Sequence, residues 1–345
     1  MSRSKGRYRW WKEFAFTTVF LLLTVWMIQF ASDVLRPPQK VYGSTWSAFR
    51  AEPEDSLDVI YLGSSYAYCD INPSMVYASS GLTSYVMAGS EQTLSITYWY
   101  LKEILETQSP AAVMLEVTSL FFKANQNYTQ QNIVYMPFSC NKLGAIVTAA
   151  EPELRLGLLF DLYFYHSRWN EIGFGDIWRA LNPIQWDARK GHTAMEGTKE
   201  GAGEVLSEVD RVVTAEDYRA NLAWLKKITD LCQEHNIQCF LTIYPSYTRS
   251  RPETYARIGR ELQAIAPEAI YCDWSDAFDT IGLIPTEHLY DGGHLNQEGT
   301  AIFSNWLGGF LIGQGVTPRS QTAENTAAWQ AAVQEWEETE AVSNP

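Results

Sequence analysis

Short apolar runs alternate with segments of helical periodicity along most of the chain. Five runs are predicted to be strands: 57–63, 84–89, 111–117, 238–245 and 269–274. Five segments are predicted to be helices: 72–81, 91–108, 214–236, 252–265 and 297–311. Alternating helices and uniformly apolar strands predict one α/β domain over 55–312, with a parallel sheet covered by helices on both faces.

Two segments depart from this alternation. Residues 119–213 interrupt it and are predicted to be an insertion in the domain. Residues 313–345 form an acidic tail of helical period, in which Trp329 and Trp336 share one face. That face could dock on the domain or on a partner, and a loosely attached, solvated helix is the favoured interpretation.

The N-terminal region predicts a membrane anchor. A basic segment, 1–13, precedes 18 residues without a charge, 14–31, which is close to the length of a transmembrane helix. We expect a span over 14–34 and a stalk over 35–54. The positive charges place the N-terminus in the cytoplasm and the domain outside. A cleaved signal peptide is the alternative, for which "QFASDV" offers a weak cleavage site.

Charge and cysteine content narrow the function classes. The net charge is −14, and the five basic residues before residue 13 leave the rest of the chain still more acidic. Nucleic acid is therefore not an expected partner. The five cysteines show no metal-ligand spacing, so we expect neither a metal nor another cofactor. Cys232 and Cys239 could pair in space, although burial as small apolar residues is the favoured interpretation.

Candidate catalytic residues follow the predicted strands. "LGSS", 62–65, closes the first strand, and "DGGH", 291–294, precedes the last helix. Carboxyl ends of parallel strands meet at one sheet edge, so we expect Ser64, Ser65, Asp291 and His294 to lie together. A serine nucleophile needs a histidine base, and a carboxylate orients that base. The amides of Ser65 and Gly89 are the predicted oxyanion donors.

These blocks resemble the SGNH (GDSL-like) hydrolase superfamily. "YLGSSYAYCDINP" stands at the first block, "VMAGSEQTLS" at the second and "YDGGHLNQEG" at the last. The resemblance implies a three-layer α/β/α, flavodoxin-like fold and assigns the nucleophile to Ser65 rather than Ser64. The third block, normally Gly-x-Asn-Asp, is replaced by "MLEVTSLFF", which has no asparagine. Thr118, Ser119 or a residue of the insertion could supply the missing donor.

One branch of the superfamily is more similar. Its members are membrane-anchored and resemble proteins of teichoic-acid D-alanylation and alginate O-acetylation, many of which work beside a membrane-bound O-acyltransferase. The resemblance extends to "YFYHSRWNE", 163–171. His166, Arg168 and Trp169 are therefore candidate substrate-binding residues. A structural Arg–carboxylate pair with a packed Trp is the alternative.

Three functions follow as expectations. The first is transfer of an acyl or acetyl group to a cell-envelope polysaccharide through an acyl-serine intermediate. The second is an esterase that removes such groups with the same triad and water. The third is a non-catalytic anchored partner of a membrane-bound O-acyltransferase.

Overall fold

The computed structural model describes residues 3–37, 46–182, 186–209 and 211–343. The chain divides into two compact units. Unit 1 comprises Met1–Pro38 and Glu153–Pro183, and unit 2 comprises Gln39–Pro152 and Ile184–Pro345. The segment 119–213, predicted to be one insertion, therefore contributes to both units.

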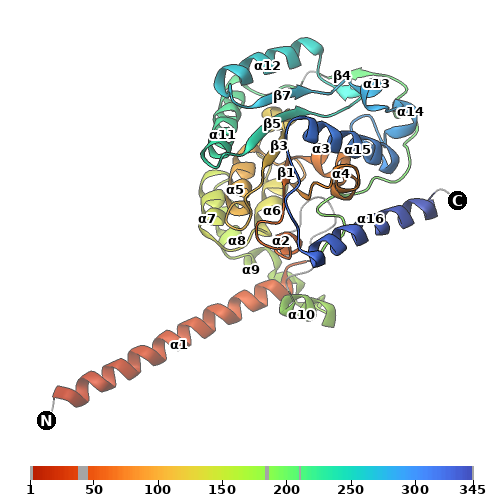
Figure 1. Ribbon diagram of the computed structural model, residues 1–345. Coiled ribbons are helices and arrows are strands. Elements are labelled where there is room, and N and C mark those ends of the chain that lie inside the picture. Colours follow the sequence, from red (N-terminus) through yellow and green to blue (C-terminus); the bar gives the residue numbers. More distant parts are fainter. Residues whose placement is uncertain (1–2, 38–45, 183–185, 210, 344–345) are drawn as a thin grey trace. The chain divides into compact units, whose positions relative to one another are not determined.

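Unit 2 is built on the predicted five-stranded parallel sheet. Its strands run in the order β2-β1-β3-β5-β7 (Figure 1), and every neighbouring pair is parallel. The chain moves from β1 to β2 on one side and then crosses to β3 on the other. This reversal places the topological switch point, where ligands bind in such sheets, at the carboxyl ends of β1 and β3. The strands are β1 (Val59–Gly63), β2 (Ser84–Ala88), β3 (Ala112–Glu116), β5 (Gln238–Ile243) and β7 (Ile270–Asp273).

Helices cover both faces of the sheet, as expected. One layer contains α5 (Leu94–Ile104), α7 (Cys140–Thr148) and α11 (Ala215–Glu234), and the other contains α3 (Ser65–Asp70), α4 (Pro73–Ser80) and α15 (Gln297–Gly313) (Figure 1). Every residue of β1, β2 and β3 is buried. Strands covered on both faces need apolar residues at consecutive positions, which explains their uninterrupted apolar runs.

Side-chain caps begin α4 and α11 at the starts of the predicted helices 72–81 and 214–236. Asn72 accepts a hydrogen bond from the amide of Ser74, and Pro73 occupies the first turn of α4. Thr214 accepts from the amide of Asp217 at the start of α11. Such caps satisfy amides that have no intrahelical acceptor, so they define helix starts from local sequence alone.

Shorter elements complete unit 2, and most were not predicted. A two-residue strand pair, β4 with β6, joins the chain near residue 207 to the segment after β5. The elements are α2 (Trp46–Phe49), η1 (Val117–Phe121), α6 (Gln126–Val134), β4 (Ser207–Glu208), β6 (Thr248–Arg249), α12 (Pro252–Ile265), α13 (Phe278–Ile281) and α14 (Pro285–His288). Of these, α12 alone matches a predicted helix.

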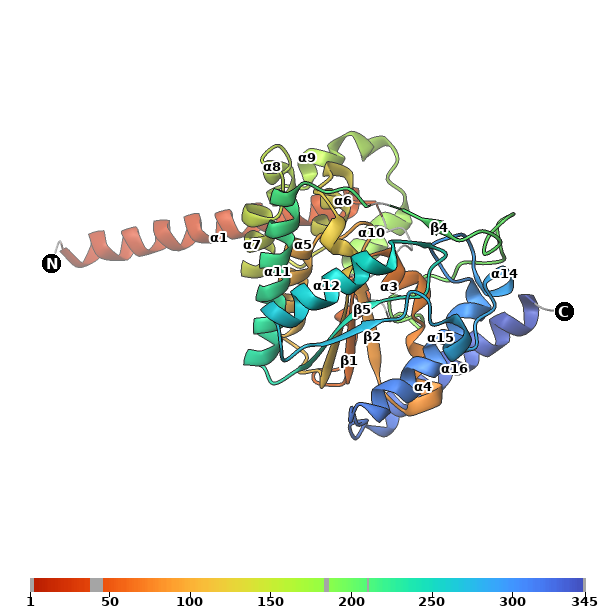
Figure 2. The ribbon, with the colours of Figure 1, turned by 90° about the horizontal axis from the view of Figure 1, so that it is seen from above.

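The C-terminal tail docks on unit 2, so the interpretation as a loosely attached helix is wrong. It forms α16 (Ala323–Ser343), which contacts α4 and runs alongside it (Figure 2). Trp329 is fully buried and stacks on Tyr77, with ring centroids 5.2 Å apart. Lys190, paired with Glu52 inside the protein, lies 4.9 Å from the Trp329 ring. Burial of a side chain as large as Trp329 favours docking, while other positions along α16 stay exposed to solvent.

Unit 1 contains the predicted apolar span. Among the described residues, one helix is long and apolar enough to cross a membrane, Trp10–Leu35 within α1 (Arg3–Leu35). Such a helix could be a membrane anchor or a signal sequence. The second part of unit 1 packs near the end of α1 as α8 (Arg155–Leu159), α9 (Leu162–Tyr165), η2 (His166–Asn170) and α10 (Phe174–Leu181).

Candidate active site

The candidate site begins at the carboxyl ends of β1 and β3. Gly63 ends β1 with φ +144°, a value that side-chain-bearing residues rarely adopt. A Cβ on Gly63 would lie 2.7 Å from the Cβ of Glu116, the last residue of β3. The glycine therefore serves both the turn into α3 and the close approach of two neighbouring strand ends.

Ser65, His294 and Asp291 form one continuous hydrogen-bonded chain. His294 Nε2 lies 2.9 Å from Ser65 Oγ, and His294 Nδ1 lies 3.0 Å from Asp291 Oδ1. Ser65 is the first residue of α3, whereas the other two residues come from the loop before α15. The fold thus joins residues 229 positions apart in the arrangement of a nucleophile, a base and an orienting carboxylate.

Backbone contacts fix the loop that carries Asp291 and His294. Asp291 Oδ1 also accepts from the amides of Gly293 and His294, at 2.9 and 3.0 Å. Gly292 O accepts from the amide of Thr248 at 2.6 Å, and a Cβ on Gly292 would lie 2.3 Å from Thr248 Oγ1. The backbone of Gly292 is not left-handed, so the reason for a glycine here is the lack of space for a side chain.

The same contacts set the charge on Asp291. Burial raises the pKa of Asp291, but hydrogen bonds from the His294 side chain and from the amides of Gly293 and His294 outweigh this effect. The net result is a pKa well below the usual range. Asp291 consequently remains ionised near neutral pH, which is the state that orients a neutral imidazole and stabilises an imidazolium.

The two serines of the first block have different surroundings. Ser64 Oγ is buried and donates to Glu116 Oε2 at 3.0 Å, while Ser65 Oγ faces His294. Glu116 Oε1 accepts from the amide of Thr118 at 2.6 Å and also from its hydroxyl. Ser64 thus belongs to a structural cluster around Glu116, whereas Ser65 has a base within hydrogen-bond reach.

Burial raises the pKa of Glu116 to about 7, although hydrogen bonds from Thr118 and Ser64 and the charge of Arg211 act in the opposite direction. The Ser119 hydroxyl donates to the carbonyl of Glu116 at 3.1 Å. The side chains of Thr118 and Ser119 are therefore both bonded to Glu116. Their predicted use as replacement oxyanion donors would need these bonds to break.

Residue Gly89, a predicted oxyanion donor, follows β2 at the same sheet edge. Its amide makes a long, 3.4 Å hydrogen bond to the carbonyl of Gly63. A Cβ on Gly89 would lie 1.8 Å from Oδ1 of Asn132, whose amide nitrogen donates to Ser90 O at 3.1 Å. Asn132 comes from α6, so the insertion places an asparagine side chain directly against this predicted donor.

Tyr66 contacts the triad and Arg211 contacts Tyr66, and the sequence patterns identified neither residue. The Tyr66 ring stacks on the His294 imidazole, with centroids 5.2 Å apart. Arg211 donates to the Tyr66 hydroxyl at 2.8 Å. Tyr66 restricts the imidazole plane from one side, and Arg211 holds Tyr66. The position of Tyr66 next to Ser65 is the one feature of the sequence that could have indicated its place in the site. No sequence feature indicated Arg211.

The predicted substrate-binding residues lie in unit 1, within η2. Arg168 pairs with Glu171 at 3.0 Å and donates to the carbonyl of Leu35 at 2.6 Å. His166 Nδ1 lies 2.9 Å from Tyr163 O, and Trp169 is 73% exposed. The Arg–carboxylate pair of the alternative interpretation is present, without the packed Trp. A role in substrate binding stays a prediction.

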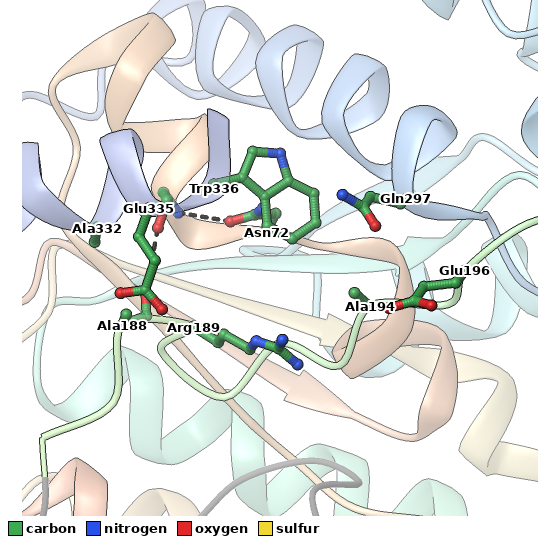
Figure 3. Close-up of a pocket in the computed structure, with 10 residues that line it drawn as sticks. Asn72, Ala188, Arg189, Ala194, Glu196, Gln297, Ala332, Glu335 and Trp336 are labelled. Atoms are coloured by element: carbon green, nitrogen blue, oxygen red, sulfur yellow. Dashed lines mark hydrogen bonds between the residues drawn. The ribbon is translucent and has the colours of Figure 1, made fainter. Parts of the chain in front are cut away.

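A separate pocket opens elsewhere in unit 2 (Figure 3). Trp336 and Glu335 contribute to it from α16, with Arg189, Glu196 and Gln297 around it. The triad residues do not line it. Within residues 3–37, 46–182, 186–209 and 211–343, no group of three or more His, Cys, Asp or Glu residues could hold a metal ion.

No protein-family model and no curated protein matches the chain. Among solved structures, it is similar to a protein from Bacteroides fragilis described as a putative acylhydrolase, with 12% identity and a TM-score of 0.36. The alignment covers 79% of this chain and 97% of that chain. A likeness at this level carries no conclusion about activity.

Proposed function

We propose that the protein is a membrane-anchored serine acyltransferase that transfers an acyl or acetyl group to a cell-envelope polysaccharide outside the cytoplasm. The observation that carries the proposal is the Ser65–His294–Asp291 chain, with contacts of 2.9 and 3.0 Å. Its position at the switch point of a parallel sheet supports it. The motif resemblance to anchored SGNH proteins supplies the expected acceptor class and the expected membrane-bound O-acyltransferase partner.

The proposed chemistry has two half-reactions. Ser65 Oγ attacks the carbonyl carbon of the acyl donor while His294 Nε2 takes the hydroxyl proton. The tetrahedral intermediate expels the donor's leaving group, which receives that proton and leaves an acyl ester on Ser65. An acceptor hydroxyl then gives its proton to His294 and attacks the ester carbonyl carbon. The bond from that carbon to Ser65 Oγ breaks, and Oγ takes the proton from His294, which restores Ser65. The amides of Ser65 and Gly89 are the proposed oxyanion donors.

An esterase is the second candidate, because the same triad accepts water in place of a sugar hydroxyl. The exposure of the site favours neither acceptor: the side chains of Asp291 and His294 are 27% and 23% exposed. Water reaching the acyl ester would release the acid.

The first experiment tests the nucleophile. A fluorophosphonate probe added to the purified full chain should label the wild type and Ser64→Ala but not Ser65→Ala. Ser64→Ala is the matched control, since its hydroxyl bonds to Glu116 and not to His294. Absence of labelling, with Ser65→Ala fully active in cells, would sink both enzymatic candidates and favour a non-catalytic subunit.

The second experiment identifies the acceptor. The wild type is incubated with an aryl acetate donor and envelope-type sugar oligomers, and acetyl groups on the oligomers and free acetate are both measured. A transferase should place most of the acetate on the sugar. Free acetate whose rate does not depend on the oligomer concentration would favour the esterase.

A further inference from the structure

Unit 1 carries a dense group of exposed apolar side chains outside the predicted span. We call residues 155–181 the collar. The collar contains α8, α9, η2 and α10, and ten of its large apolar side chains are exposed. They are Leu156, Leu159, Phe160, Tyr163, Trp169, Ile172, Phe174, Ile177, Trp178 and Leu181. Exposed apolar side chains at this density mark a surface that is covered in the functional state.

The collar is bonded to the end of α1. Arg168 Nη1 donates to the carbonyl of Leu35 at 2.6 Å, and Arg179 Nη2 donates to the carbonyl of Arg36 at 2.7 Å. Arg36 in turn pairs with Asp161. The last carbonyls of a helix have no intrahelical donor, and such groups are costly to leave unsatisfied next to lipid. The collar arginines satisfy two carbonyls at this point.

The length of the apolar segment sets the depth of these contacts. The charge-free residues 14–31 number 18 and, at about 1.5 Å a residue, extend about 27 Å, close to the roughly 30 Å hydrocarbon thickness of a bilayer. Leu35 lies four residues further, or about 6 Å. If α1 spans a membrane, the collar contacts α1 where hydrocarbon gives way to lipid headgroups.

We propose that the collar lies in the headgroup layer of the membrane leaflet in which α1 ends, with its apolar side chains against the acyl chains. This inference rests on the anchor part of the proposed function. Trp and Tyr favour that layer because one end of each ring is apolar and the other is polar. The hydrogen bonds from Arg168 and Arg179 also hold the collar at the end of the helix that is proposed to span.

Charge indicates how the collar would bind. The segment 155–181 contains three basic and three acidic residues, so it has no excess of positive charge. Binding should therefore come from apolar burial and not from attraction to anionic lipids. The occupant is a lipid surface of any headgroup charge.

Photo-crosslinking of the full chain in vesicles tests the proposal. The photoreactive aromatic residue p-benzoylphenylalanine replaces Trp178, which is 58% exposed, or Phe138 of unit 2, which is 69% exposed. Replacing an exposed aromatic with another aromatic leaves the fold least disturbed. Lipid adducts at 178 should exceed those at 138 by at least about fivefold, equally in phosphatidylethanolamine vesicles with and without phosphatidylglycerol.

A third position separates the collar from the anchor. The same probe at Trp26, 61% exposed within α1, reports whether α1 lies in lipid. Adducts at 26 but not at 178 would overturn the collar and leave the anchor intact. No adducts at either position would instead overturn the anchor. Crosslinks from 178 to a second copy in vesicles, or to another membrane protein in cells, would also overturn a lipid occupant.

Discussion

Asp291 determines what His294 can do. Its Oδ1 accepts from His294 Nδ1 and from two backbone amides, so the carboxylate holds both the ring and the loop. With the proton on Nδ1, Nε2 presents a lone pair to the Ser65 hydroxyl. The contacts around Asp291 therefore specify the tautomer that the proposed reaction requires.

Replacing Asp291 with Asn should lower kcat for hydrolysis of an aryl acetate by about 10³–10⁴-fold with little change in KM. The Asn oxygen can keep the contacts that Asp291 Oδ1 makes with two amides and with His294 Nδ1, but a neutral amide does not stabilise the imidazolium that forms when His294 takes the serine proton. Lys199→Met is the control, because Lys199 contacts the other Asp291 oxygen at 3.5 Å and is largely exposed. Equal losses in both variants would contradict the assigned role of Asp291.

Glu116 is a second residue whose pKa is shifted by its surroundings. Its carboxyl is fully buried beneath Ser64 and Thr118, and burial raises its pKa to about 7. The folded state therefore binds a proton that the unfolded state has already lost between about pH 4.5 and 7. Over that interval, the free energy of unfolding should fall as pH rises.

The variant Glu116→Gln should remove this component. Between pH 5 and pH 8, urea unfolding of the wild type should show a loss of stability about 2–3 kcal/mol greater than that of the variant, from the part of the pKa difference that lies in this interval. Gln can still accept from Thr118 and pair with the Ser64 hydroxyl, so packing should be preserved. Parallel pH profiles for the two proteins would rule out this charge state for Glu116.

Helices α15 and α4 pack through a small-residue contact behind the site. A Cβ on Gly308 would lie 2.3 Å from Ser79 Oγ and 3.1 Å from Val76 O, whereas a Cβ on Gly309 would meet nothing within 4 Å. The helical period of α15 can be read from its sequence. Which of these adjacent glycines allows α4 to approach depends on how the helices are placed.

The pair Gly308→Ala and Gly309→Ala separates packing from helix propensity. Both remove a helical glycine, which by itself stabilises by up to about 1 kcal/mol. Gly309→Ala should show this gain, while Gly308→Ala should destabilise by about 1–3 kcal/mol through overpacking. Midpoints of chemical denaturation measure both. A gain of the same size in both variants would show that α15 and α4 do not approach so closely.

The apolar helix of unit 1 decides where the protein acts. If it is an uncleaved anchor, the intact mass of the protein extracted from membranes should include residues 1–31, and an alkaline wash should leave the chain in the membrane. A mature chain that begins after residue 31 would instead identify α1 as a signal peptide. The basic residues before Glu13 also predict that protease added outside intact cells removes unit 2 but spares the N-terminus.

The sequence by itself determined the five strands, the capped helices, the apolar span and the candidate residues Ser65, Asp291 and His294. Apolar period, caps and turn residues act over a few positions, so they can be read without coordinates. Tertiary structure alone decided that Tyr66 stacks on His294, that Asn132 lies against Gly89, that Trp329 is buried and that the collar binds the end of α1. Each of these contacts joins residues that belong to no common sequence motif. Their energies come from packing and hydrogen bonds between distant segments, which a local pattern does not record.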